Sequence, residues 1–225
     1  MSQERNQSAS AWVFGSIRDD IMSGKIRPRA RLRELHLARQ LGVSQSTVRE
    51  ALFHLEHSGL VVRVPHCGTT VASFSQDELQ ERVDVRLVLE EVAFVKASQN
   101  DLRQLVEDLD TILSTALNTE EGFEHSQSEL AFHRRVWREA NNETLYRTLQ
   151  DLTAPLFAFA GMVATREGRK LSSFVAGHQP LVDALQGRDP SVIREAVRNH
   201  IVSLQGGFFR LNGSSSSGEK LTEAT

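Results

Sequence analysis

The chain has 225 residues, of which 40% are hydrophobic and 24% are charged, with a net charge of −3 and a single cysteine, Cys67. One cysteine excludes an intrachain disulfide, no apolar run approaches the roughly 18 residues of a membrane span, and the polar first ten residues lack a secretory signal. These features predict a cytoplasmic protein with no membrane partner.

Charge is distributed unevenly along the chain. Residues 1–75 hold 10 Lys and Arg against 6 Asp and Glu, a net charge of +4. Residues 76–225 hold 16 against 23, a net charge of −7. This asymmetry suggests a basic binding module joined to an acidic body, although chance alone also produces such differences.

The first 75 residues carry helical signals and then strand signals. Apolar residues at every fourth position predict a helix over residues 11–23, and a basic linker containing Pro28 follows it. RELHLARQLG predicts a short helix that ends at Gly42, and Ser44 is a candidate N-cap for a second helix that ends at Gly59. LVVRV, the turn PHCG and TTVASF then predict a two-stranded hairpin.

The turn LGVS between the two short helices has the length and the glycine of a helix-turn-helix motif. In this motif the first residues of the second helix point toward base edges in the major groove, and the hairpin would form a wing. Gln pairs with adenine, Arg with guanine or phosphate, and hydroxyl groups with phosphate. The pattern alone leaves a helical hairpin with polar caps as the alternative. The candidate DNA contacts on this pattern are Ser44, Gln45, Ser46, Thr47 and Arg49, with the wing tip at His66 and Gly68.

The same segment resembles the winged-helix domain of the GntR family of bacterial transcriptional regulators, most specifically in LARQLGVSQSTVREALFHLEHSGLV. The resemblance implies contacts with double-stranded operator DNA from the residues named above, and it adds Arg33 as a backbone contact. Gln45 and Thr47 stand where the family usually has Arg and Pro, and Arg29 follows Pro28 where Gly is usual. Because a guanine-reading Arg is missing, the operator sequences of relatives do not transfer to this chain.

From Ser75 onward the strand signals stop. Ser75 is a candidate N-cap for a helix that begins with acidic residues. Five more helices are predicted over residues 101–118, 120–140, 143–165, 170–187 and 190–210. The predicted fold is mainly α, with a winged helix-turn-helix of three helices and a two-stranded wing over 11–75 and an antiparallel six-helix bundle over 76–211. Residues 1–10 are predicted to be flexible and 212–225 to be a disordered tail.

The bundle contains a carboxylate and three histidines that could bind a metal together. Glu129 and His133 lie one helical turn apart, and His178 and His200 lie near the buried faces of two later helices. A bundle core can gather such groups from facing helices, and this ligand set suits Zn²⁺ or Ni²⁺. A lone helical histidine is more often a surface residue, so solvated side chains remain the alternative at this point.

Residues 76–210 resemble the FadR-type effector domain in its metal-binding FCD form, with the landmarks RLVLE, ELAFHRRVWREANN, GHQPLVDAL and GRDPSVIREAVRNHI in the family's order. The resemblance implies a divalent metal on Glu129, His133, His178 and His200, with Glu129 standing where Asp is usual. It also implies a small carboxylate effector, with Arg86 as a candidate clamp. A surface or interdomain salt bridge is the alternative role for Arg86.

Together these features predict a ligand-responsive repressor that binds its operator as a homodimer and has no enzymatic activity. An acyl-CoA-type sensor of the same fold without a metal is one alternative. A metal-dependent hydrolase is another, because three imidazoles and a carboxylate could activate water on zinc.

Overall fold

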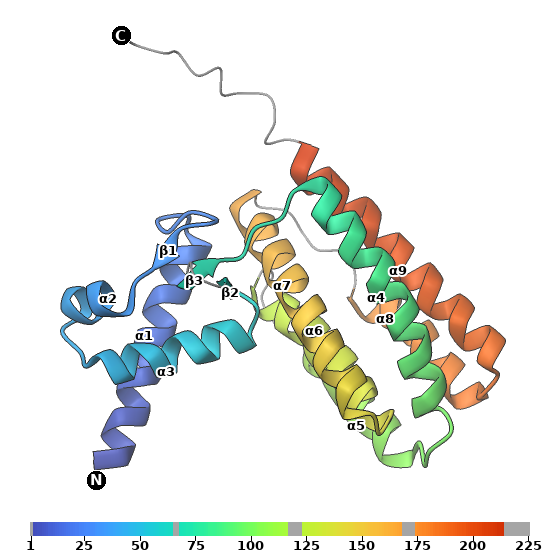
Figure 1. Ribbon diagram of the computed structural model, residues 1–225. Helices are drawn as coiled ribbons and strands as arrows, with labels where there is room; N and C mark the ends of the chain where they lie inside the picture. The colour runs from blue at the N-terminus through green and yellow to red at the C-terminus, as the bar shows by residue number, and fades with distance from the viewer. Residues whose placement is uncertain (1, 65–67, 117–122, 168–173, 214–225) are drawn as a thin grey trace.

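The computed structural model describes residues 2–64, 68–116, 123–167 and 174–213. The described chain forms an N-terminal head, residues 2–74, and a helical bundle, residues 76–213, which lie side by side (Figure 1). The candidate contact His66 and the predicted tail beyond residue 213 lie outside the described residues. Within the described part of the chain, no helix combines the length and the apolar character that crossing a membrane requires.

The three helices of the head are α1 (Ser2–Met22), α2 (Glu34–Leu41) and α3 (Gln45–His57). The first begins well before residue 11, so the stretch predicted to be flexible is helical from Ser2. The predicted ends of α2 and α3 are observed. Gly42 takes the left-handed conformation, with φ 68°, and the side chain of Ser44 accepts a hydrogen bond from the backbone N–H of Thr47 at 3.1 Å.

The wing belongs to a sheet of three antiparallel strands in the order β1-β3-β2. The predicted hairpin corresponds to β2 (Val61–Val64) and β3 (Gly68–Val71), in which Val62 pairs with Thr70. A third strand, β1 (Arg31–Leu32), pairs with the other edge of β3 inside the segment predicted to be a linker. The two-stranded prediction was therefore incomplete, because a strand of two residues has no alternation that a sequence pattern can reveal.

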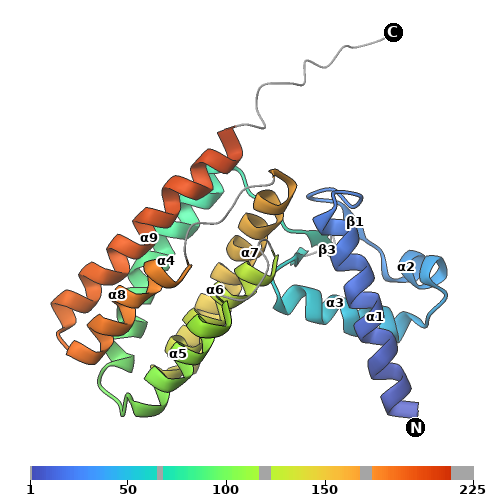
Figure 2. The same ribbon diagram turned by 180° about the vertical axis from the view of Figure 1, so that it is seen from behind.

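Among its described residues, the bundle contains the six helices expected. They are α4 (Gln76–Ala97), α5 (Arg103–Ala116), α6 (Phe123–Glu139), α7 (Glu143–Glu167), α8 (Phe174–Gly187) and α9 (Pro190–Gly213). The N-cap predicted at Ser75 is completed by Glu78, whose side chain accepts a hydrogen bond from the backbone N–H of Ser75. Both views show α4 and α9 side by side along the edge of the bundle farthest from the head (Figures 1 and 2).

The hydrophobic core of the head continues into the bundle. Leu156, Phe159 and Met162 of α7 belong to the same buried cluster as Leu52 and Leu55 of α3. The contact is especially close just after α3. Gly59 has φ 82°, and a Cβ added there would lie 2.1 Å from the carbonyl oxygen of Ala154. The head is therefore packed directly against α7.

Candidate metal centre and DNA-contacting surface

The four predicted metal ligands converge in the bundle. Glu129 and His133 extend from α6, His178 from α8 and His200 from α9. One ligand atom from each of these side chains lies within 4.8 Å of the others, and none of the four residues is more than 7% exposed. These residues are not solvated surface side chains, which was the alternative to a metal site, because three helices bring them to one buried point.

Hydrogen bonds orient two of the imidazoles. Nδ1 of His133 lies 2.9 Å from a carboxylate oxygen of Glu90, and Nδ1 of His200 lies 3.0 Å from the carbonyl oxygen of Gly177. Both partners are acceptors, so each Nδ1 carries the proton and each Nε2 carries a lone pair. The two Nε2 atoms are 3.3 Å apart. Two lone pairs therefore point into the same small space. In metal sites, hydrogen bonds to the outer nitrogen orient histidine ligands in this way.

Burial sets the ionisation of the cluster. It lowers the pKa of His133, and it lowers that of His200 to about 3, so both imidazoles are neutral near pH 7. Burial alone would raise the pKa of the Glu129 carboxyl, but the neighbouring imidazoles, above all that of His178, lower it to about 2. The group therefore combines the neutral imidazoles of His133 and His200 with an ionised carboxylate.

Glu90 is a buried residue of this centre that the sequence prediction did not include. It accepts hydrogen bonds from Arg86 Nε at 2.9 Å, Trp137 Nε1 at 3.1 Å and His133 Nδ1 at 2.9 Å. Burial would raise the pKa of Glu90, but its contacts with His133 and Arg86 and its hydrogen bonds from His133 and Trp137 hold it below its usual range. In the sequence, Glu90 is the last residue of the landmark RLVLE, four positions after Arg86, but it was not included among the candidate site residues.

Arg86 also lies inside the centre and is only 1% exposed. Its Nη2 is 3.3 Å from Nε2 of His133, and its guanidinium lies over the ring of Phe157, 4.6 Å from the ring centroid. A surface salt bridge does not describe this residue. The ion pair with Glu90 leaves one edge of the guanidinium directed toward the histidines.

The residues of the centre fit a divalent cation. The charges of Arg86 and Glu90 offset each other, and Glu129 adds a further carboxylate beside the neutral imidazoles of His133 and His200. Oε2 of Glu129 has no hydrogen-bond donor among the described residues, although Nε2 of His178 lies 3.2 Å away. His125 is also buried, and its Nε2 lies 3.8 Å from the other carboxylate oxygen. A buried carboxylate oxygen without a donor is costly, and a cation would remove that cost.

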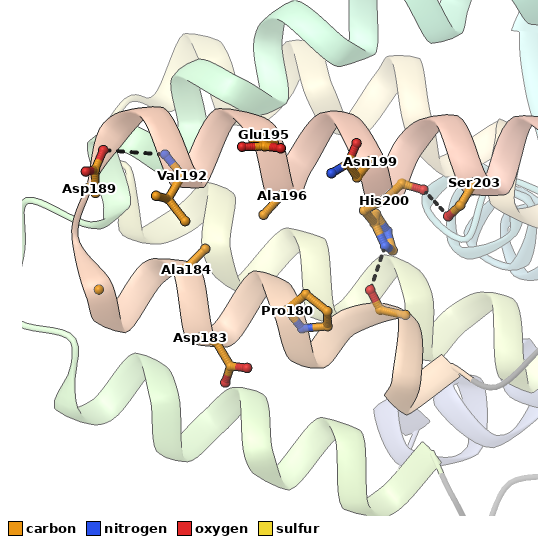
Figure 3. Close-up of a pocket in the computed structure, with 12 residues that line it drawn as sticks. Pro180, Asp183, Ala184, Asp189, Val192, Glu195, Ala196, Asn199, His200 and Ser203 are labelled. Carbon is orange, nitrogen blue, oxygen red and sulfur yellow. Dashed lines mark hydrogen bonds between the residues drawn. The ribbon is translucent and has the colours of Figure 1, made fainter.

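A groove of about 770 Å³ runs between α8 and α9 and reaches His200 (Figure 3). Figure 3 shows His200 extending from α9 toward the backbone of α8, where it meets Gly177. Asp183, Asp189 and Glu195 line the groove. Their negative charges disfavour a carboxylate ligand there.

The head presents most of its candidate DNA contacts on an exposed surface. Arg33, Ser44, Gln45, Ser46, Arg49 and Gly68 are exposed. Thr47 is only 3% exposed, and its hydroxyl lies 2.7 Å from that of Ser44. The structure therefore places Thr47 in the helix cap rather than on the surface, which sequence spacing alone did not distinguish.

Glu34 of α2 holds the two candidate base readers of α3. It accepts hydrogen bonds from Gln45 Nε2 at 2.9 Å and from Arg49 Nη2 at 2.8 Å. The side-chain hydrogen bond from Arg49 contributes most to lowering the pKa of Glu34, and that from Gln45 adds to it, against the opposing effect of partial burial. Contacts between residues 11 and 15 positions apart leave no periodic signal in the sequence.

A winged helix-turn-helix with a polar exposed surface at the start of its second helix, packed on an all-helical domain, defines a DNA-binding transcriptional regulator. Residues 10–71 match the family described as "Bacterial regulatory proteins, gntR family", and residues 81–203 match the FCD domain. The chain therefore belongs to the GntR family of bacterial regulatory proteins and carries an FCD domain. Proteins of this family are DNA-binding regulators rather than enzymes.

Relatives and solved structures agree with this assignment. The chain is 29% identical to the "Probable D-xylose utilization operon transcriptional repressor" of Paenarthrobacter nicotinovorans, over 85% of this chain and 86% of the relative. It is 26% identical to the "Gluconate operon transcriptional repressor" of Bacillus licheniformis, over 88% and 84%. E. coli McbR/YncC superposes with a TM-score of 0.64 at 21% identity, over 90% of this chain and 97% of that chain. A GntR regulator from Rhodococcus sp. RHA1 gives 0.63 at 22% identity, over 90% and 98%. At these identities the two structures show a shared fold.

Proposed function

We propose that this regulator is a repressor that binds operator DNA as a homodimer and releases it in response to a small organic acid recognised at a divalent metal. The observation that carries the proposal is the buried convergence of one carboxylate and three imidazoles within 4.8 Å. Repression is supported by the names of the two relatives, both of which are transcriptional repressors. A palindromic operator would match the two-fold symmetry of a homodimer.

Glu129, His133, His178 and His200 would hold the metal. Three imidazoles and a carboxylate favour Zn²⁺, with Ni²⁺ as the second choice. The free oxygen of Glu129, 3.2 Å from Nε2 of His178, supports direct ligation by this longer side chain. When bound, the metal supplies a positive charge and open positions that attract an anionic ligand.

Arg86 would bind the carboxylate of the effector. A divalent cation would add two positive charges to the buried group, and an anion would offset part of that charge. Arg86 directs Nη2 toward the histidines, 3.3 Å from Nε2 of His133, and is the cation best placed to share that anion. The acidic groove between α8 and α9 does not suit the same ligand. In His133 and His200 the proton lies on Nδ1 and leaves Nε2 able to bind a cation. This arrangement supports a metal-binding regulator over a metal-free acyl-CoA sensor.

The test is metal analysis of purified protein, followed by a thermal-shift screen of small organic acids on the metal-loaded and metal-free forms. We expect about one divalent metal per chain, which a chelator removes, and a stabilising acid that acts only on the loaded form. His200→Ala should lose the metal. Asn199→Ala, at the exposed neighbouring position on α9, should keep it. Wild-type protein without metal, with no change in stability in His200→Ala, would overturn the metal centre.

A further inference from the structure

Helix α4 has two unlike faces. One face is buried and carries Arg86 and Glu90 into the centre. The opposite face exposes three valines, Val85, Val88 and Val92, which are 50%, 62% and 44% exposed. Residues three and four positions apart share one side of a helix, so these valines form a continuous apolar stripe on the outside of the protein.

The valine stripe of α4, residues Val85, Val88 and Val92, ends in opposite charges. Glu81 lies one turn before Val85, and Lys96 lies one turn after Val92. Both are exposed, and the spacing places them on the same side of the helix as the valines. Neither forms an ion pair with another described residue of its own chain. An apolar centre with one acidic end and one basic end is complementary to itself when reversed.

We propose that the valine stripe is the surface on which a second copy of this chain docks, with the two α4 helices antiparallel about a two-fold axis near Val88. Reversal places Val85 against Val92 of the partner subunit and Glu81 against Lys96 of the partner subunit. Both pairings hold at once because residues 81 and 96, like 85 and 92, are equidistant from the midpoint of the stripe. The paired segment spans about 22 Å at about 1.5 Å per residue.

A second copy fits this surface better than an unrelated partner does. A two-fold interface is made of the same patch on both subunits, so the patch must be complementary to itself. The charged ends of this stripe satisfy that condition in the antiparallel arrangement, whereas a parallel one would place like charges together. This inference rests on the homodimer in the proposed function and adds the surface and register of its contact.

The location of the stripe also gives the interface a regulatory role. Arg86 lies one residue after Val85 and two before Val88, yet its side chain enters the centre. A ligand that repositions Arg86 would therefore act on the helix that joins the two subunits, and through it on the spacing of the two heads.

The experiment measures the oligomeric state of the full-length chain by sedimentation equilibrium. Wild type should be a dimer, and Val88→Asp should raise the dimer dissociation constant by at least about tenfold, because it buries a charge at the centre of the contact. Val192→Asp, at a valine of α9 that is 51% exposed, is the matched control and should leave the dimer intact. Circular dichroism and thermal unfolding verify that each variant is folded.

Charge reversal tests the register. Glu81→Lys and Lys96→Glu should each weaken the dimer, and the double variant should restore it, because the pairs re-form with exchanged signs. A dimeric wild type that is insensitive to Val88→Asp would overturn the surface and leave the homodimer standing. A monomeric wild type would overturn the homodimer itself. Weakening by both single variants without rescue would overturn the antiparallel register.

Discussion

His133 and Arg134 are consecutive residues of α6 that contact different parts of the protein. The imidazole of His133 lies in the candidate metal centre, 3.3 Å from Nε2 of His200. The guanidinium of Arg134 donates a hydrogen bond at 2.6 Å to the carbonyl oxygen of His57, the last residue of α3. Gln150 of α7 donates to the same carbonyl at 3.3 Å. The helix that carries two candidate metal ligands, α6, therefore also holds the end of α3, the helix with the candidate DNA contacts.

Arg134→Met is expected to weaken communication between the two sites. It keeps the aliphatic stem but removes the donor to His57, so movement of α6 is transmitted less well to α3. The factor by which metal or effector changes operator affinity should fall about fivefold, a loss on the order of 1 kcal/mol of coupling. Fluorescence anisotropy with labelled operator, with and without metal, measures this factor. Arg138→Met is the control, since Arg138 contacts Tyr146 on the surface. Unchanged coupling in Arg134→Met would exclude this route.

Arg49→Ala is expected to weaken operator binding by about 1–3 kcal/mol, as the loss of one base or phosphate contact does. Arg49 is exposed near the start of α3, where the motif faces the major groove. Mobility shifts at several salt concentrations give the affinity and its salt dependence together. An affinity equal to that of wild type would remove Arg49 from the DNA-contacting surface.

Glu34→Gln is expected to tighten binding to random-sequence DNA more than binding to the operator. The carboxylate of Glu34 holds Arg49 and Gln45, and its charge repels nearby phosphates. Removing that charge frees Arg49 for non-specific contacts, so discrimination between the two DNAs should decrease severalfold. Competition binding with unlabelled random DNA measures the ratio. A ratio unchanged from wild type would show that Glu34 has no part in selecting the sequence.

The metal-free protein is expected to lose stability as the pH falls below 6.5. His200 has a pKa of about 3 in the folded protein against an ordinary value of 6.5. Over that interval the unfolded chain binds a proton that the folded chain does not, so the free energy of unfolding decreases as the pH decreases. Urea unfolding at about pH 7.5 and about pH 5 measures the difference. His200→Asn should show a shallower pH dependence, and an equal slope in both proteins would contradict the assignment to His200.

Gly59→Ala is expected to destabilise the junction between head and bundle by about 1–3 kcal/mol. Gly59 has a positive φ, and the added Cβ would collide with backbone atoms of Ala154 and Pro155. Thermal unfolding measures the loss. Gly15→Ala in α1 is the control, because nothing lies within 4 Å of its added Cβ and alanine favours a helix interior by about 0.5–1 kcal/mol.

Local signals predicted much of this structure. The caps at Ser44 and Ser75 and the stop at Gly42 act through contacts within a few residues, so the sequence around each residue contains the whole interaction. The convergence of His178 and His200 on α6 was predicted by combining helix faces with a family resemblance. Periodicity alone places a side chain on a face but does not say which other helix it meets.

The features that escaped prediction depend on long-range pairing. Strand β1 exists because β3 offers a free edge to Arg31 and Leu32. Glu90 follows Arg86 at a spacing that solvated helix surfaces also use, and its function depends on Trp137 and His133 from another helix. Thr47 lies between exposed neighbours, yet its side chain turns into the helix cap.

The shared hydrophobic core of the head and α7 limits how freely these domains can be exchanged. Leu156, Phe159 and Met162 are buried by the head, so a bundle expressed alone would present them to water. A transplanted head would have to supply both an apolar surface for these side chains and a glycine where Ala154 makes its close approach. Recombination between relatives at the domain boundary would therefore succeed where the incoming head retains both that apolar surface and the glycine at the end of α3.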